Sequence, residues 1–263
     1  MSYGASAYSP VWESIIGYTR PQYIRPYAKR PNADELALSL RDELAEGLVL
    51  YLPFVRFVSH RPDTLTEVFD RSPYNNHGTI NGAVWQTLPS GKSALSFDGA
   101  NDYVEVPNDE SICGEFSEIT IAAWIKPIKE DAQIVDNRVS GEGGYVFRID
   151  KYKKLYFELR DQGSNLYFVT SASVIPLDEF SFVSAAYKSP YMKIYINGNL
   201  DRSVDRGTFT VGSSSGNLYI GRAYWGIAKI FNGIIGELRI YSRALSKKKN
   251  KRLFNLTRVF YGV

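Results

Sequence analysis

The stretch YMKIYINGNLDRSV, residues 191–204, decides the fold class of this chain. Met192, Ile194 and Ile196 alternate with more polar residues, and a period of two is typical of a β-strand with one buried face. The pair Asn197-Gly198 follows directly and suits the positive φ angles of a tight turn. The stretch therefore predicts a β-hairpin.

Short apolar runs at β spacing continue outward from this hairpin. The chain holds 19 tyrosines and 14 phenylalanines, which favour half-buried pleated surfaces over helices. Strands without intervening helices predict an all-β fold of two packed antiparallel sheets. The runs occupy residues 47–54, 83–88, 93–99, 102–107, 119–127, 145–150, 154–160, 166–171, 180–187, 192–198, 218–223 and 234–245.

The chain divides into three parts. Residues 1–31 hold four prolines, each of which also disfavours helix in the preceding residue, so we expect an extended arm. Residues 32–46 open on Asn32 as an N-cap, with Glu35 three residues later, and place leucines at helical spacing, so we expect a short amphipathic helix. Residues 47–263 form the sandwich, with a short basic helix at its end.

Composition and charge further limit the classes of protein and of site that this chain can form. One cysteine, Cys113, excludes a disulfide within the chain and a thiolate zinc cage. The N-terminus lacks the pattern of a secretion signal, and no stretch approaches a membrane span. Net charge is +3 in residues 1–33, −6 in residues 34–246 and +6 in residues 247–263. Two basic ends on an acidic body permit self-association.

Six segments resemble, in the same order, the laminin-G-like, concanavalin A-type family of jelly-roll sandwiches. They are GLVLYLPF, FDRSPYNNHGTINGAVW, ALSFDGANDYVEVP, ITIAAWIKP, MKIYINGN and FNGIIGELRIYSRALS. The resemblance spans roughly Gly47 to Asn255 and implies a two-sheet antiparallel jelly roll. It does not imply one activity, because relatives include lectins, adhesins, glycosidases and structural domains.

The resemblance also implies a candidate calcium site. Asp98, Asn101 and Asp102 offer oxygen ligands within five residues. In the family, a cation often lies between this loop and an acid of a later strand, for which Glu237 is the nearest candidate here. The alternative is that Asp98 and Asp102 only satisfy backbone amides in a tight turn.

Catalytic groups are scarce. Relatives that cleave polysaccharides carry carboxylates on alternate positions of one strand, whereas the acidic groups EDAQIVD (130–136) and ELRD (158–161) do not alternate in this way. The chain has two histidines, His60 and His77, and His77 belongs to a turn that is structural in the family. We therefore expect a protein that is not an enzyme.

Glycan binding would require exposed aromatic rings beside polar groups. Tyr224 and Trp225 occupy an expected loop and are the first candidates, with Tyr145 and Asp136 as weaker neighbours. A loop aromatic that folds back over the core is the alternative for Trp225. We expect Trp85 and Trp124, which lie inside strand segments, in the core.

The arm suggests a docking role. Three Arg-Pro steps alternate with tyrosines, a composition that suits a protein surface, and the acidic body would repel nucleic acid. The predicted docking residues are Arg20, Tyr23, Arg25, Tyr27 and Arg30. A disordered tail is the alternative.

Together these patterns favour a non-catalytic structural and surface-recognition module. We expect a component of an assembled particle or filament, of the virion type, whose arm docks on neighbouring subunits, or an extracellular or cell-surface protein. The first alternative is a calcium-dependent glycan-binding adhesin, and the second is a glycoside hydrolase.

Overall fold

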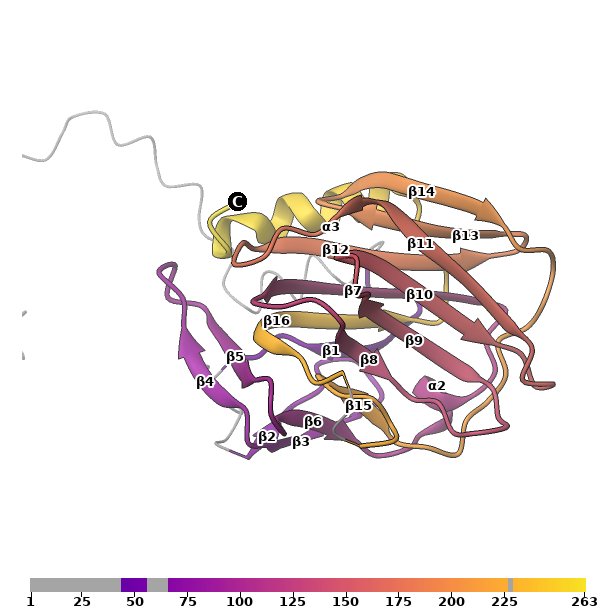
Figure 1. The fold of residues 1–263 in the computed structure, drawn as a ribbon, viewed down its shortest axis with the longest axis horizontal. Helices are drawn as coiled ribbons and strands as arrows, with labels where there is room; N and C mark the ends of the chain where they lie inside the picture. The colour runs from indigo at the N-terminus through magenta and orange to yellow at the C-terminus, as the bar shows by residue number, and fades with distance from the viewer. Residues whose placement is uncertain (1–43, 56–65, 227–228) are drawn as a thin grey trace, which may run out of the picture. The chain divides into compact units, whose positions relative to one another are not determined.

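The computed structural model describes residues 44–55, 66–226 and 229–263, and its strands form two antiparallel sheets (Figure 1). Sheet A has the order β14-β13-β12-β7-β16-β5-β4, with β1 also paired to β16. Its strands are β1 (Leu48–Leu52), β4 (Val84–Thr87), β5 (Ser93–Asp98), β7 (Glu118–Pro127), β12 (Ser181–Lys188), β13 (Tyr191–Ile196), β14 (Asn199–Asp205) and β16 (Asn232–Tyr241).

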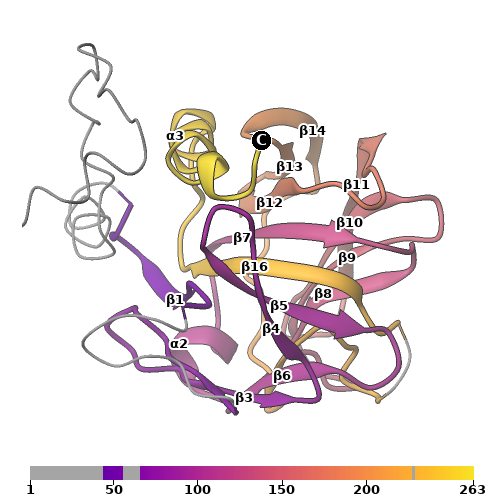
Figure 2. The ribbon, with the colours of Figure 1, turned by 90° about the vertical axis from the view of Figure 1, so that its left-hand side faces the viewer.

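Sheet B packs against sheet A and has the order β11-β10-β9-β8-β15-β6-β3-β2. Its strands are β2 (Glu67–Val68), β3 (Gly78–Asn81), β6 (Tyr103–Val106), β8 (Ala132–Asp136), β9 (Gly144–Ile149), β10 (Lys154–Arg160), β11 (Leu166–Val174) and β15 (Leu218–Ile220). Figure 2 shows the two layers from the side. The predicted two-sheet antiparallel sandwich is confirmed.

The main core lies between the sheets and comes from alternate residues of each strand. On β10, for example, Leu155, Phe157 and Leu159 are fully buried in this core. The intervening side chains of the strand therefore lie on the outer face of sheet B. The predicted hairpin is present, because β13 and β14 pair directly and Asn197 and Gly198 both have positive φ.

A second apolar cluster covers the outer face of sheet A. The C-terminal helix α3 (Lys247–Thr257) and the short helix η2 (Arg258–Phe260) supply much of its outer layer. Trp124 of β7 is fully buried there, stacks on Tyr261 at 4.3 Å between ring centroids, and donates its Nε1–H to Thr257 Oγ1 at 2.8 Å. The expected core position of Trp124 and the expected basic C-terminal helix are both confirmed.

Three strands and one helix were not predicted, namely β2, β3, β8 and the four-residue helix α2 (Glu110–Cys113). Among the described residues, no helix is long and apolar enough to cross a membrane. The predicted arm, residues 1–31, lies outside the described residues, and so does nearly all of the predicted helix, residues 32–46.

Candidate functional site

The outer face of sheet B carries a cluster of charged and aromatic side chains, which we call the Arg138 face. It consists of Asp136, Arg138, Arg148, Tyr156, Glu158, Phe168, Tyr224 and Trp225. Strand alternation places Tyr156 and Glu158 there, because their neighbours on β10 fill the core. No described helix covers this face, whereas α3 covers the outer face of sheet A (Figures 1 and 2).

Arg138 joins two carboxylates from different strands. Its Nη1 lies 2.5 Å from Glu158 Oε1 of β10, and its Nη2 lies 3.1 Å from Asp136 Oδ2 of β8. Asp136 Oδ1 also accepts the Arg138 Nε–H at 3.2 Å. All three residues are buried, so the guanidinium compensates two desolvated charges at once. The cluster fixes the position of Arg138 on the sheet.

The pKa values reflect this environment. Burial raises the pKa of Asp136 above its ordinary value, although its bonds to Arg138 oppose that shift. Burial alone would lower the pKa of Arg138, but the bonds and charges of Asp136 and Glu158 raise it overall. Burial, together with the charge of Glu158, raises the pKa of Tyr156 to about 12. Arg138 therefore keeps its charge at neutral pH, and Tyr156 keeps its proton.

A stack of aromatic rings and guanidinium groups extends from this cluster across β9, β10 and β11. The rings of Tyr156 and Phe168 lie 5.4 Å apart and nearly parallel. Arg148 lies 4.3 Å from the centroid of the Tyr156 ring, and Arg206 lies 5.0 Å from that of Phe168. Phe168 is 38 % exposed, so this stack keeps part of an aromatic ring in contact with water.

Tyr224 and Trp225 lie on the other side of Arg138. The guanidinium lies 5.1 Å from the Trp225 ring and 5.8 Å from the Tyr224 ring, and the backbone N–H of Tyr224 donates to Asp136 Oδ2 at 3.4 Å. Trp225 is nevertheless 48 % exposed. The segment that carries Tyr224 and Trp225 contacts the sheet through Arg138 and Asp136, and the ring of Trp225 stays accessible to solvent.

This arrangement suits a ligand with both apolar faces and hydroxyl groups. Exposed rings offer flat surfaces for stacking, while arginine and carboxylate groups beside them offer donors and acceptors. The guanidinium and the rings hold one another through cation–π contacts, so little side-chain freedom is lost when a ligand binds.

Two of the three predicted ligand-binding residues, Tyr224 and Trp225, lie together with Asp136 on this face. The prediction for Tyr145 is wrong. Its side chain is fully buried in the main core and its hydroxyl donates to the Ile112 carbonyl at 2.9 Å. Tyr145 alternates with Phe147 on β9, and both point inward.

The structure does not assemble the four predicted calcium ligands. Asp98 Oδ1 accepts the Ala100 N–H at 2.7 Å, and Asp102 Oδ2 accepts the Asp98 N–H at 2.8 Å, as expected for a tight turn. Asn101 lies exposed in the same loop. Within the described ranges, no group of three or more His, Cys, Asp or Glu side chains is placed to hold a metal ion.

The assignment of Glu237 to the calcium site is wrong. Asp98 pairs with Asn232 at the start of β16, and Glu237 lies five residues further along that strand. Glu237 is buried and pairs with Arg239 at 3.1 Å. Calcium binding by the Asp98–Asp102 loop alone stays a prediction.

Sequence reasoning missed Arg138, Arg148, Tyr156, Glu158 and Phe168 as site residues. A signal was present for two of them, because Tyr156 and Glu158 alternate with apolar residues on β10 and so had to face outward. Arg138 had no comparable signal. It follows β8, a strand that was not predicted, and its partner Glu158 lies 20 residues away.

The acids of the two sequence groups EDAQIVD and ELRD meet in space through Asp136 and Glu158. Arg138 lies between them and binds both. Glu158 also accepts from Arg160 Nε at 3.0 Å and from the Tyr156 hydroxyl at 3.1 Å. Both carboxylates are thus engaged as acceptors. The predicted docking residues Arg20, Tyr23, Arg25, Tyr27 and Arg30 lie outside the described residues.

A family model described as the concanavalin A-like lectin/glucanases superfamily matches residues 98–249. Solved structures with a similar fold include the binding domain of Paraclostridial Mosquitocidal Protein 1, with a TM-score of 0.66 and 17 % identity over 84 % of this chain and 56 % of that chain. A second is the botulinum neurotoxin serotype D ligand binding domain in complex with N-acetylneuraminic acid, with a TM-score of 0.63 and 16 % identity over 83 % and 54 %.

A third similar structure is domain 4 of AbnA, a GH43 extracellular arabinanase from Geobacillus stearothermophilus, in complex with arabinotriose. Its TM-score is 0.60, with 16 % identity over 78 % of this chain and 97 % of that chain. The chain spans about half the length of the two toxin domains. These likenesses show the fold. A search of curated protein sequences found no match.

Proposed function

Because the chain belongs to the concanavalin A-like lectin/glucanase superfamily, we propose that its sandwich is a non-catalytic glycan-recognition module that binds its ligand on the Arg138 face. The single observation that carries this proposal is the half-exposed ring of Trp225, held over a guanidinium that is itself fixed by two buried carboxylates. A flat ring beside fixed polar groups is what a sugar face requires.

Two considerations support the proposal. Two of the three similar structures are binding domains, and two of the three, domain 4 of AbnA with arabinotriose and the serotype D domain with N-acetylneuraminic acid, hold a bound sugar. In addition, Asp136 and Glu158 are both bonded to Arg138, an arrangement that serves to position the arginine. Paired carboxylates of a glycosidase must instead act on the scissile bond.

The test is a glycan array on the full chain and on Trp225→Ala, with each repeated in a calcium chelator. We expect the substitution to weaken binding roughly tenfold or more, the loss typical of an aromatic anchor. The matched control is Tyr152→Ala, which truncates an aromatic side chain that is 66 % exposed and lies outside the Arg138 face. This variant should bind glycans as strongly as the parent. Equal loss in both variants, or no glycan bound, contradicts the proposal.

The chelator arm separates two versions of the function. Binding that survives the chelator places recognition on the Arg138 face alone. Binding that is lost in the chelator assigns a role to the Asp98–Asp102 loop, the only part of the predicted calcium site that remains together. Turnover of a bound polysaccharide above background would indicate a glycosidase instead.

We also propose that the N-terminal arm serves assembly of a particle or filament, such as a virion, or attachment at a cell surface. The proposal rests on the sequence, in which three Arg-Pro steps precede an acidic body. Replacement of Arg20, Arg25 and Arg30 by Ala should lower the assembled fraction in light scattering. An unchanged size distribution at high concentration contradicts the assembly role of the arm.

A further inference from the structure

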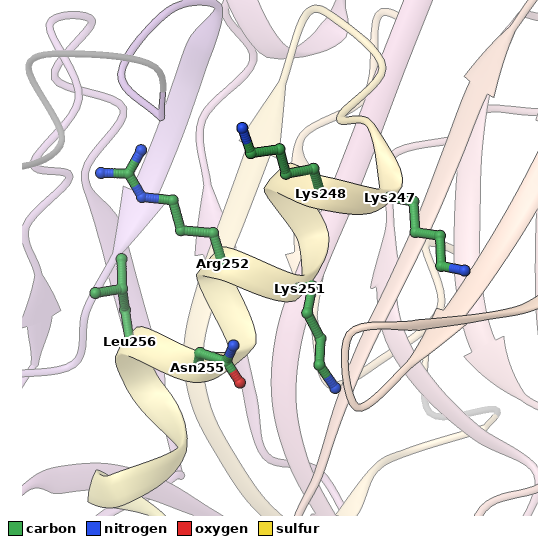
Figure 3. A pocket seen from close by; sticks show the side chains of 6 residues that line it. All are labelled: Lys247, Lys248, Lys251, Arg252, Asn255 and Leu256. Atoms are coloured by element: carbon green, nitrogen blue, oxygen red, sulfur yellow. The ribbon is translucent and has the colours of Figure 1, made fainter.

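Helix α3 presents a row of cations on its exposed side. Lys247, Lys248, Lys251 and Arg252 line one open hollow together with Asn255 and Leu256, and Figure 3 shows Lys247 and Lys248 extending away from the helix axis. The opposite side of α3 is apolar, since Leu253 and Phe254 are buried in the second cluster against sheet A. The helix therefore keeps its cations on the surface.

The position of these cations disfavours the helix itself. The N-terminus of an α-helix carries partial positive charge, so acids stabilise the first turn and lysines destabilise it. The first turn of α3 holds no acid, and the whole helix, with the sequence KKKNKRLFNLT, holds none. Burial of its apolar side and the Ser246 cap hold the helix despite this cost. An anionic surface near the first turn would remove the cost.

The neighbours of α3 do not supply that surface within the described residues. Lys251 Nζ donates to Asn199 Oδ1 at 3.2 Å, a neutral acceptor, and Lys249 lies 3.9 Å from Glu46. Neither Lys247 nor Lys248 forms an ion pair or hydrogen bond with another described residue. The charge of the first turn is therefore largely uncompensated in that part of the chain.

A segment rich in acids lies elsewhere on the same molecule. Residues 93–125 contain seven acids and no lysine or arginine. Asp109, Glu110 and Glu115 of this segment are exposed at helix α2, and none of them forms an ion pair with another described residue. Hydrogen bonds from Ser111 lower the pKa of Asp109, which keeps that carboxylate charged.

These two surfaces lie far apart on one molecule. Both views show α3 near the top of the sandwich and α2 below its middle (Figures 1 and 2). We propose that the basic side of α3 in one copy docks on the acidic α2 segment, Asp109 to Glu115, of a second copy. Such a contact joins two different surfaces, so it can propagate head to tail into a ring or filament.

A second copy fits better than an unrelated polyanion because the described chain before α3 is itself acidic. Residues 44–55, 66–226 and 229–246 carry 22 acids against 18 lysines and arginines, which is −4, whereas residues 247–263 carry +6. Charge complementarity of this kind steers association and weakens as salt rises. This proposed contact between α3 and α2 depends neither on glycan binding by the Arg138 face nor on the N-terminal arm.

A charge-swap experiment on the full chain tests the proposal. One variant carries Lys247→Glu and Lys248→Glu, and the other carries Glu110→Lys and Glu115→Lys. By light scattering at low salt, we expect the parent to associate and each variant alone to associate roughly tenfold or more weakly. An equal mixture of the two variants should recover the parent's association, because each acidic α3 then meets a basic α2.

The controls separate this contact from other causes. Lys129→Glu with Lys151→Glu makes the same change in net charge at exposed positions elsewhere and should associate like the parent. Glutamates in the first turn of α3 favour the helix, so the melting temperature of that variant should not fall. Replacement of Arg20, Arg25 and Arg30 by Ala leaves this contact intact.

Recovery in the mixture, lost again in high salt, supports the docking of α3 on α2. The proposal is overturned if the parent is monomeric at high concentration, if the mixture stays dissociated, or if the α3 variant loses only binding to polyphosphate or anionic vesicles, which would identify a different anionic partner. Glycan binding by both variants is expected to stay unchanged, so failure here does not bear on the Arg138 face.

Discussion

The two outer faces of the sandwich differ in what their strands carry. On sheet A, the outward positions of β7 include Ala122 and Trp124, and α3 with Tyr261 buries them in a second apolar cluster. On sheet B, the outward positions of β10 are Tyr156 and Glu158, and no described helix covers them. One face is therefore covered by apolar packing, and the described helices leave the other uncovered.

Two tryptophans show what this difference means. Trp124 is fully buried, stacked and hydrogen-bonded, whereas Trp225 is half exposed over Arg138. The same side chain thus contributes to stability on one face and offers a contact surface on the other. Burial of an aromatic ring stabilises the fold in proportion to the apolar area removed from water. Replacement of Trp124 should therefore lower stability, whereas replacement of Trp225 should mainly lower binding.

The largest expected effect is that of Trp124→Ala. The substitution leaves a cavity beneath α3 and removes the ring stacked on Tyr261. We expect it to lower the free energy of unfolding by about 3–5 kcal/mol, the range for a buried tryptophan. Urea denaturation followed by circular dichroism measures this loss. A loss below about 1 kcal/mol would mean that α3 does not form part of the core.

The second effect concerns the buried charges of the Arg138 face. Arg138→Met leaves Asp136 and Glu158 without their shared partner, and we expect a loss of about 3 kcal/mol at neutral pH. The pKa of Asp136 is already raised by burial, so protonation favours the folded state and the loss should shrink as pH falls through that raised pKa. Urea denaturation of the parent and the variant near pH 7 and near pH 5 measures the loss of stability at neutral pH and its decrease at lower pH.

Arg160→Met is the matched control for Arg138→Met. Arg160 contacts Glu158 but not Asp136, and its side chain is 28 % exposed. A partly solvated ion pair contributes little, so the control should lose less than about 1 kcal/mol. Equal losses in the two variants, or a loss that grows at acid pH, would contradict the role of Arg138 as the link between the two carboxylates.

The covered face was easier to predict from sequence than the exposed one. The strand pattern ITIAAWIKP placed Trp124 in a strand and in the core, and the paired hairpin of residues 191–204 follows from its alternation and its turn. Such local patterns report the period of two that every half-buried strand must keep. The sandwich and its C-terminal helix could therefore be predicted.

The Arg138 face depends on register and so could be predicted only in part. Its central ion cluster needs β8 beside β9 and β10, and β8 lies within an acidic segment and contains a register shift between Gln133 and Val135. Tyr145 could have been excluded by its alternation with Phe147. The position of Glu237 could not have been predicted from sequence, because it depends on how far β16 extends past its pairing with β5.

A smaller effect on the covered face concerns one hydrogen bond. Thr257→Val keeps the shape of the side chain but removes the acceptor for Trp124 Nε1–H, which lies at 2.8 Å. An unpaired buried donor should cost about 1–2 kcal/mol. Thr210→Val, at an exposed position, is the control and should change stability by less than about 0.5 kcal/mol. Thermal denaturation of both variants checks the difference.

The smallest expected effect is on the titration of Tyr156. Burial and the nearby Glu158 charge raise its pKa to about 12, so its phenolate should form roughly two pH units above that of a free tyrosine. The group is neutral in both folded and unfolded chains below pH 10, and between pH 10 and 12 only the unfolded chain loses the proton. Stability contributed by Tyr156 is therefore present below pH 10 and is lost as pH rises toward 12.

Tyr156→Phe should remove one late-titrating group from the ultraviolet titration curve and should flatten the alkaline fall in stability. Tyr152→Phe, which removes the hydroxyl of an exposed ring at a loop position, is the matched control. The comparison distinguishes a ring held against the Arg138 cluster from a ring in water. If Tyr156→Phe leaves the late part of the titration curve unchanged, Tyr156 is solvated, and the outer face of sheet B is less ordered than its hydrogen bonds and stacked rings indicate.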